Sequence, residues 1–512
     1  MADSKRLPSA DALAWANTAI TAGMGRRRFL AGLGAAAAAA ASPLRVQAMQ
    51  SHSRVAVVGA GLAGLSCADR LSQRGIAATV YEASTRAGGR CWSLRNRFPG
   101  QVVERGGELI DNLHKTMIGY ARRFGLTLED YEKEEGEVFY HFDGQAFPEH
   151  AVVDEYRDFV AAMRDDLRTL SNEPTADVHQ DADVALDNTS LAEYLAMRGA
   201  GPIAAKAIEA AYIAEYGLEA AEQSALNFLL FIHADRRSRF VPFGIFSDER
   251  YHVVQGNDAI AEGLARDLPA PVRYGHRLRR VARSTDGRIA LTFRVDDADV
   301  TTMHDYVVLT LPFSVLRELE LADNLQLPLW KRAAIDELGY GTNAKMMVGF
   351  DSPYWRALGS KGASYSDLPN HQATWETNPA RATAHRAVLT DYSSGIRGAS
   401  LDPSQVQTEA ARFIGDLERV FPGAVAHAAL DAGQYRAHLE HWPSNPLSKG
   451  SYTCYRPGQF TTIAGNEGKR VGNLLFAGEH TNSFYEWQGF MEGACLSGLE
   501  AANDILDDLK KG

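Results

Sequence analysis

The 512-residue sequence contains only four cysteines, Cys67, Cys91, Cys454 and Cys495. They are too few and too widely spaced for a disulfide scaffold or for a zinc site of paired cysteines. Basic residues are in the minority, because 53 Lys and Arg face 64 Asp and Glu, a net charge of −11. This balance argues against a protein that coats nucleic acid. Beyond residue 48 no stretch approaches 18 apolar residues, so we expect a soluble mature protein without a stable membrane anchor.

The N-terminus has the sequence pattern of an export signal peptide. Residues 24–48 read MGRRRFLAGLGAAAAAAASPLRVQA, with a basic cluster, an apolar run over 29–41 and a Val46-Gln47-Ala48 ending that suits signal peptidase. This resembles a twin-arginine signal; the alternative, a transmembrane anchor, needs a longer and less alanine-rich run. We therefore assign 1–48 to a signal peptide and expect the twin-arginine machinery to export the folded protein to the periplasm or the extracellular space. Removal of 1–48 leaves 47 basic and 62 acidic residues, a net charge of −15.

The hydrophobic pattern predicts alternating strands and helices without internal repeats. A β-branched run at 54–58, a helical stretch at 62–74 and a run at 77–82 predict a strand–turn–helix–strand unit. Residues 115–250 are predicted to be mostly helical, with the polar segment 172–188 as an exposed loop. The other predicted helices cover 154–170, 190–199, 202–215, 403–420 and 490–509, and the other predicted strands cover 251–255, 289–294, 306–311, 345–350, 386–392 and 474–477.

A glycine-rich turn lies between the first predicted strand and helix, with the sequence Gly59-Ala60-Gly61-Leu62-Ala63-Gly64. The first glycine permits a tight turn, the second lets backbone approach a pyrophosphate, and the third permits close helix–strand packing. The helix N-terminus then offers free N–H groups and the positive end of its dipole to the phosphates. Glu82 ends the second strand, where an acid binds ribose hydroxyls and disfavours a 2′-phosphate. The pattern predicts a dinucleotide site.

The segment after this turn extends the motif and has the form E-x5-G-G-R, from Glu82 and Ala83 to Gly88-Gly89-Arg90. It resembles the extended ADP-binding motif of the FAD-containing amine oxidase superfamily, in which the twin glycines pass the pyrophosphate and the arginine brings a positive charge to it. The next family segment, which passes near the flavin, resembles Glu104-Arg105-Gly106-Gly107, followed here by Glu108 and Leu109.

The C-terminal segment 474–494, LLFAGEHTNSFYEWQGFMEGA, resembles the second flavin motif of the same superfamily. The resemblance implies that Gly478 and Glu479 lie beside the ribityl–phosphate chain. It places Met491, after Gly489 and Phe490, at a helix N-terminus where its backbone N–H meets the flavin pyrimidine carbonyl. A weaker correspondence places the Val281 backbone against the adenine side.

The resemblance covers roughly 52–512 and implies an α/β fold. A Rossmann-like FAD-binding domain of the amine oxidase and glutathione-reductase type is interleaved with an α+β substrate domain. Because nucleotide signals lie at both ends of the chain, we expect the FAD-binding domain to be discontinuous, with the active site at the domain junction. The FAD-binding domain is predicted to comprise 52–119, 248–321 and 440–512, and the substrate domain the helical part 120–247 and the mixed-sheet part 322–439.

The resemblance also assigns a reaction centre. Lys345, at the start of a predicted apolar strand, corresponds to a lysine that holds a water near flavin N5; the alternative is an edge-strand lysine that reaches solvent. Tyr452 and Phe490 correspond to the two walls of an aromatic cage that steers the amine, and Trp442 is expected to pack against the isoalloxazine. Ser451 stands where related enzymes carry the cysteine that bonds FAD, so we predict non-covalent FAD.

The implied reaction is oxidation of the C–N bond of an amine or L-amino acid to an imine. Water converts the imine to a carbonyl compound and ammonia, while O2 is reduced to hydrogen peroxide. Two other hypotheses are considered. A flavin desaturase would act at C–C bonds, but Lys345 and the aromatic pair argue against it. A flavin-free binding module is disfavoured by the C-terminal motif. The sequence is compatible with a homodimer. No metal is expected, because His438 and His441 lack a third ligand.

The sequence leaves the substrate open. Leu109 occupies the position where amino-acid oxidases often carry a carboxylate-binding arginine, although Arg456 or another arginine could serve. Residues 243–258 nevertheless resemble the bacterial amino-acid-oxidase branch. Glu108 and Asp111 could instead hold the second ammonium of a diamine or polyamine, or be ordinary solvated loop carboxylates.

Overall fold

A computed structural model describes residues 54–133, 135–232, 240, 242, 247–383, 385–482 and 487–511. These residues all belong to one compact unit, Ser51–Gly512. The predicted signal peptide lies outside the described residues. The proposed division of the remaining chain into two interleaved domains stays a prediction.

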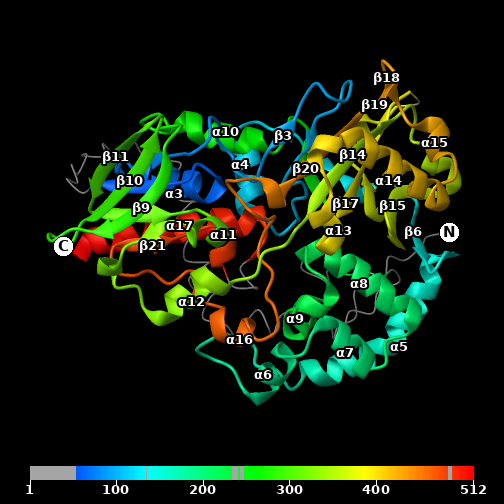
Figure 1. Cartoon of the computed structure of the whole chain (residues 1–512), viewed down its shortest axis with the longest axis horizontal. Helices are drawn as coiled ribbons and strands as arrows, with labels where there is room; N and C mark the ends of the chain where they lie inside the picture. The colour runs from blue at the N-terminus through cyan, green and yellow to red at the C-terminus, as the bar shows by residue number, and fades with distance from the viewer. Residues whose placement is uncertain are drawn as a thin grey trace, which may run out of the picture. The chain divides into compact units, whose positions relative to one another are not determined.

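A four-stranded parallel sheet joins the two ends of the described chain. Its strand order is β2-β1-β12-β21, formed by Thr79–Tyr81, Val55–Val58, Tyr306–Leu309 and Leu474–Phe476. The apolar run Val55–Val58 is buried on both faces, as a central parallel strand requires. Helices α3 (Leu62–Ser72) and α17 (Met491–Lys511) pack against each other, and Figure 1 shows them in blue and red beside this sheet. The predicted glycine turn and the C-terminal motif are thereby brought together.

The four strands of a second sheet follow helix α10 (Asp258–Asp267) in the sequence. Its order is β11-β10-β9-β13, formed by Ala298–His304, Ile289–Val295, Arg277–Arg283 and Glu320–Leu321. The β10 residues Ile289, Leu291 and Phe293 are buried and alternate with more exposed ones, the period-2 pattern of a strand with one face in the core.

A seven-stranded sheet is formed by strands that lie between residues 137 and 441. Its order is β20-β14-β17-β16-β15-β6-β7. Strand β14 (Ala344–Phe350) is buried along its whole length, and Lys345 pairs in register with Tyr392 of β17 and Glu440 of β20. The other strands are β6 Glu137–Phe142, β7 Gln145–Phe147, β15 Ser360–Leu368, β16 His371–Glu376, β17 Ala387–Ser393 and β20 Ala437–His441.

Helices α5 to α9 lie below this sheet in the view of Figure 1. They span Glu149–Leu167, Asp181–Asp187, Leu191–Met197, Pro202–Tyr216 and Ala225–Ile232. The remaining α-helices are α4 Lys115–Arg123, α11 Phe313–Leu316, α12 Leu329–Glu337, α13 Gly395–Ser400, α14 Val406–Val420, α15 Ala424–His427 and α16 Phe460–Ile463. Short strand pairs are formed by β3 Ser93–Leu94 with β4 Val103–Glu104, β5 Leu128–Asp130 with β8 Tyr251–Val253, and β18 Leu430–Asp431 with β19 Gln434–Tyr435.

The prediction of an exposed loop over 172–188 is wrong in its second half. Residues Asp181–Asp187 form a helix that begins with a capping box between Gln180 and Asp183. Asp187 is fully buried and accepts hydrogen bonds from Ser224 and Thr461. The polar composition of this segment reflects buried hydrogen bonding as well as solvent exposure.

Two further features concern the part of the chain that the structure describes. None of its helices is long and apolar enough to cross a membrane. It also contains no group of three or more His, Cys, Asp or Glu side chains placed to hold a metal ion. His438 contacts Glu440, and His441 contacts the Gly398 carbonyl and Ser444.

Candidate active site

One cavity of about 380 Å³ collects almost all of the predicted site residues. Its lining includes Gly59, Gly61, Leu62, Ala63, Glu82, Ala83, Gly88, Gly89, Arg90, Gly106, Gly107, Glu108, Leu109, Lys345, Trp442, Tyr452, Gly478, Glu479, Gly489, Phe490 and Met491. Segments that are hundreds of residues apart in sequence therefore face a common space.

Gly64 and Val281 do not line this cavity. A Cβ at Gly64 would collide with the Gly59 carbonyl oxygen, so this glycine permits close packing of helix and turn. Val281 is fully buried in β9, where it pairs with Leu291 and its carbonyl accepts from the Ala322 N–H. On this strand the cavity is lined by Arg277, Leu278 and Arg279 instead.

The glycine-rich part of the lining fits the pyrophosphate and ribose of FAD. Gly61 is the N-cap of α3, and a Cβ built on it meets no atom within 4 Å, so a side chain there would project into the open cradle. Gly61 forms a parallel bridge with Gly88, whose φ of +106° requires glycine. The Glu82 carboxylate accepts from the Ala60 and Ser84 N–H groups, both at 2.8 Å, and has further lone pairs for ribose hydroxyls.

An ion pair connects the two flavin motifs. The Arg90 guanidinium donates to Glu479 at 2.6 Å and to the Ser451 carbonyl at 2.7 Å. Glu479 also accepts from the Thr453 hydroxyl and the Gly489 N–H. These contacts connect the segment 451–453, the C-terminal motif and the ADP motif. The negative charge of Glu479 also offsets part of the positive charge that Arg90 is expected to bring to the pyrophosphate.

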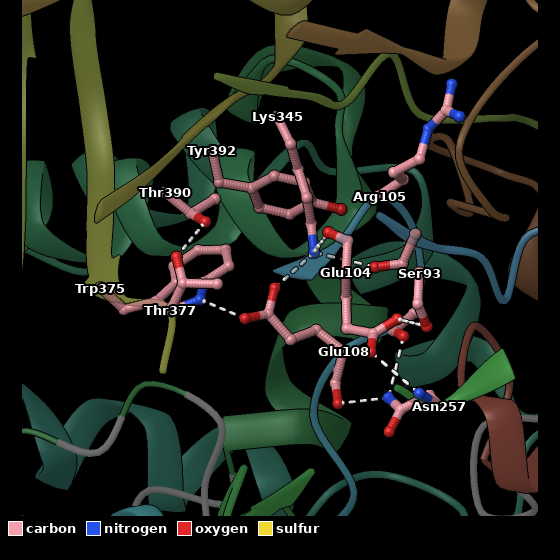
Figure 2. Close-up of polar contacts among 12 residues, drawn as sticks. Ser93, Glu104, Arg105, Glu108, Asn257, Lys345, Trp375, Thr377, Thr390 and Tyr392 are labelled. Carbon is pink, nitrogen blue, oxygen red and sulfur yellow. Dashed lines mark hydrogen bonds and ion pairs between the residues drawn. The ribbon is translucent and has the colours of Figure 1, made fainter. Parts of the chain in front are cut away.

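The Lys345 ammonium points toward the 104–108 segment, as Figure 2 shows. The ammonium donates to the Glu108 carboxylate at 2.6 Å and to the carbonyls of Gly106 and Glu104 at 2.8 and 3.3 Å. Both charged side chains are about 4% exposed. Because an ammonium has three donors, a water could be held by Lys345 only after one of these contacts is released.

The same segment is fixed from its other side. The Asn257 side-chain amide donates to the carbonyls of Gly107 and Glu108 at 3.0 and 2.7 Å, a contact visible in Figure 2. The Trp442 indole donates to the Arg105 carbonyl at 2.9 Å, and a Cβ at Gly106 would come within 3.0 Å of the Trp442 ring. The backbone of 105–108 is therefore rigidly placed against the cavity.

Aromatic side chains line the space next to Lys345. The hydroxyls of Tyr452 and Tyr392 lie 3.0 Å apart, and the rings of Tyr392 and Trp375 meet edge to face with centroids at 5.5 Å. The Trp375 indole donates to Glu108 at 3.0 Å. Phe490 also lines the cavity. Trp375 and Tyr392 were missed from the sequence, because only the pairing of β14, β16 and β17 places them beside Lys345.

The cavity wall near these rings is acidic. Asp111, Glu215 and Glu249 line it together with Glu108. Burial raises the pKa of Asp111 to about 7, and burial together with the neighbouring carboxyls raises the pKa of Glu249 well above its usual range. Arg456, a sequence candidate for binding a substrate carboxylate, instead pairs with Glu222 at the exposed surface. Leu109 lines the cavity at the other candidate position.

The comparisons with known proteins identify the family. The chain matches the profile described as flavin containing amine oxidoreductase over residues 62–506, and it belongs to that family. An L-amino-acid oxidase of Siganus canaliculatus is 24% identical over 478 residues, which is 89% of this chain and 86% of the relative. The Arabidopsis thaliana protein named "Probable polyamine oxidase 4" is 24% identical over 463 residues, 88% of both chains.

A solved structure of putrescine oxidase bound to putrescine has a TM-score of 0.74 and 20% identity, and the match covers 89% of this chain and 99% of that chain. This likeness confirms the predicted α/β fold. Family membership makes the protein a flavin-containing amine oxidase, an enzyme whose cofactor is FAD.

The residue at the position of the covalent cysteine favours dissociable FAD. Ser451 donates to the Asn343 side chain and has no sulfur with which to form a thioether. Cys454 is buried and donates weakly to the Tyr455 carbonyl, and it does not line the cavity. We therefore expect acid precipitation of the purified holoprotein to leave the yellow chromophore in the supernatant. Absorbance of the washed pellet measures the outcome, and colour that stays with the precipitated chain would refute non-covalent binding.

Proposed function

We propose that this protein is an oxidase that converts the C–N bond of a primary amine into an imine at the cavity described above. A balanced reaction takes R–CH2–NH2 and O2 to R–CH=NH and hydrogen peroxide, after which water and the imine give an aldehyde and ammonia. Bound FAD supplies the two-electron redox chemistry. The observation that carries the proposal is that one cavity is lined both by the glycine-rich segments of the two motifs and by the aromatic side chains of Tyr392, Tyr452 and Phe490.

The protein residues orient and desolvate the amine. Tyr452, Tyr392 and Phe490 line the cavity with aromatic rings, whose faces favour an amino group that is partly cationic. Because Lys345 is neutralised by Glu108, it adds little net positive charge to repel that group. Trp442 and the 105–108 backbone give the cavity a fixed floor, which supports a reactive geometry.

The charge distribution favours an amine without an α-carboxylate. The arginines in the described cavity lining are Arg86, Arg90, Arg277 and Arg279. The first two contact the glycine-rich motif and Glu479, and the other two lie on β9 beside the segment that contacts Glu82. A substrate carboxylate near the aromatic rings would instead face Asp111, Glu215 and Glu249. L-amino-acid oxidation is the second candidate, supported by the relative of that name.

Hydrogen peroxide release tests the reaction. Purified holoenzyme should produce peroxide and ammonia in equal amounts with at least one primary amine from a panel of monoamines, diamines, polyamines and L-amino acids. A coupled peroxidase assay and an ammonia assay give the two yields. Lack of turnover with every panel member would refute the proposed oxidase activity.

We also propose export through the twin-arginine route, on the basis of the sequence at 24–48. Replacement of Arg26, Arg27 and Arg28 by lysine should retain the full-length protein in the cytoplasm of a bacterial host, whereas the unchanged chain should be recovered from the periplasm. Fractionation with antibody detection distinguishes the two locations, and equal export of both forms would contradict this route.

A further inference from the structure

We propose that Asn343 is a positioning residue that holds three cavity-lining segments together on the side of the aromatic rings. This inference rests on the proposed amine oxidation and adds to it a residue that acts through others. Asn343 lies two residues before Lys345, is fully buried and does not itself line the cavity. Its side chain therefore influences an amine only through the residues that it bonds.

Both N–H groups and the oxygen of the Asn343 amide have partners. The nitrogen donates to the Ala214 carbonyl at 2.6 Å and to the Ser394 hydroxyl at 2.7 Å. The Oδ1 atom accepts from the Ser451 hydroxyl. A buried amide that is bonded in three directions has one defined orientation, so it fixes the positions of its partners relative to one another.

Each partner lies within two residues of a side chain that lines the cavity. These side chains are Glu215 and Tyr216 beside Ala214, Tyr392 beside Ser394, and Tyr452 beside Ser451. The partners are 129, 51 and 108 residues away from Asn343 in the sequence. One buried side chain thus connects the end of α8, the end of β17 and the segment that carries Tyr452.

The chain around Asn343 is built to admit its side chain. A Cβ at Gly217, whose φ is +76°, would lie 2.1 Å from Asn343 Oδ1, and a Cβ at Gly341 would lie 2.8 Å from the same atom. The Ala214 carbonyl belongs to the last turn of α8, where carbonyls lack partners within the helix. The Asn343 amide satisfies this carbonyl and so joins the helix end to the start of β14.

The Tyr452 hydroxyl depends on the same carbonyl. It donates to the Ala214 oxygen at 3.4 Å and lies 3.0 Å from the Tyr392 hydroxyl. The Tyr452 backbone is held separately, because its carbonyl accepts from the Gly341 N–H at 2.8 Å. Loss of the Asn343 side chain is therefore expected to leave the Tyr452 backbone in place and to let its ring shift relative to Tyr392.

A displaced Tyr452 ring is expected to slow C–N oxidation without weakening FAD binding. In the proposed reaction the aromatic rings orient the amine, and a misplacement of about 1 Å can lower a reaction rate by about 100-fold. The partners of Asn343 lie outside the glycine-rich segments, and the bond from Arg90 to the Ser451 carbonyl does not involve the Asn343 side chain. FAD affinity should therefore stay near that of the unchanged protein.

The test is the rate constant for flavin reduction at saturating amine, measured anaerobically by stopped-flow absorbance. The amine is the member of the monoamine, diamine, polyamine and L-amino-acid panel that the unchanged enzyme oxidises fastest. Asn343→Ala should lower this rate constant by about 10- to 100-fold. The FAD dissociation constant and the rate constant for reoxidation by O2 should change by less than about 3-fold. A merely structural residue would lower stability and FAD content but not the reduction rate per bound flavin.

Ser451→Ala gives a milder variant and a double-variant test. It removes one of the three bonds and should lower the reduction rate constant by about 2- to 10-fold. In the Asn343→Ala background, Ser451→Ala should change the rate by less than about 2-fold, because the bond is already absent. Multiplication of the two single effects would refute action through this bond. If Asn343→Ala does not fold, an unchanged reduction rate in Ser451→Ala overturns the proposal.

Asn466→Ala is the matched control. Asn466 is also a buried asparagine, its side chain donates to the Thr462 carbonyl and accepts from Lys469, and it does not line the cavity. It should lower the free energy of unfolding and leave the reduction rate per bound flavin unchanged. A folded, flavin-loaded Asn343→Ala variant that is reduced at the normal rate would overturn the positioning role and leave amine oxidation standing. Failure of every panel amine to reduce the unchanged enzyme defeats both.

Discussion

Replacement of Lys345 by methionine is expected to destabilise the protein and to slow at least one half-reaction. The change leaves Glu108 as an unpaired buried carboxylate and removes the donor that holds the Gly106 carbonyl. Breaking a buried ion pair on one side costs about 3–5 kcal/mol. Denaturant unfolding should measure that loss, and stopped-flow absorbance should show slower reduction or reoxidation of the flavin.

A double variant separates charge pairing from the function of the lysine. Lys345→Met with Glu108→Gln removes both charges, so most of the lost free energy of unfolding should return, while turnover should stay low because the 105–108 segment is still released. Lys331→Met is a contrasting single variant, since Lys331 is buried and donates to the Asn466 and Glu467 carbonyls but does not line the cavity. Wild-type rates in both half-reactions for Lys345→Met would refute the role assigned to this residue.

Replacement of Gly61 by valine is expected to abolish FAD binding. The new side chain would project into the cradle, because nothing lies within 4 Å of a Cβ at this position and the residue faces the cavity. A branched side chain there excludes the close backbone approach that a pyrophosphate requires. We expect the FAD dissociation constant to rise by at least about 100-fold, which corresponds to roughly 2.7 kcal/mol.

Gly119→Ala serves as the control for Gly61→Val. Gly119 is an exposed helical glycine that also has open space around a Cβ, but it lies outside the cavity. Equilibrium dialysis with FAD measures both variants, and circular dichroism checks that the apoproteins are folded. Normal FAD affinity in a folded Gly61→Val variant would show that the glycine turn is not the phosphate cradle.

Local motifs predicted which glycine-rich segments line the cavity, and their contact with a dinucleotide stays a prediction. Gly59, Gly61, Leu62 and Ala63 of the glycine-rich turn, the twin glycines and residues of the C-terminal motif line one cavity, because backbone geometry of this kind is specified by short sequences. The strand at 345–350 was also predicted within one residue of its bounds, since a continuous apolar run is characteristic of a buried strand.

The substrate half depended on pairings that a single sequence does not reveal. Lys345 bonds Glu108, which is 237 residues away, and Tyr392 reaches the site only through the register of β14 with β17. Strands β15 and β16 were missed because they are rich in serine, threonine and histidine. Ser364 and Ser366 are buried and bond His371 across the hairpin, so polar residues take core positions there.

Anaerobic reduction of the bound flavin tests the central claim most directly. Addition of an oxidisable amine without oxygen should bleach the visible flavin band of the holoenzyme, and admission of O2 should restore the band with one equivalent of hydrogen peroxide. Putrescine and butylamine are the first substrates to compare, because they share a chain length and differ in the second amino group. A band that stays oxidised with monoamines, diamines, polyamines and L-amino acids alike would contradict C–N oxidation at this cavity.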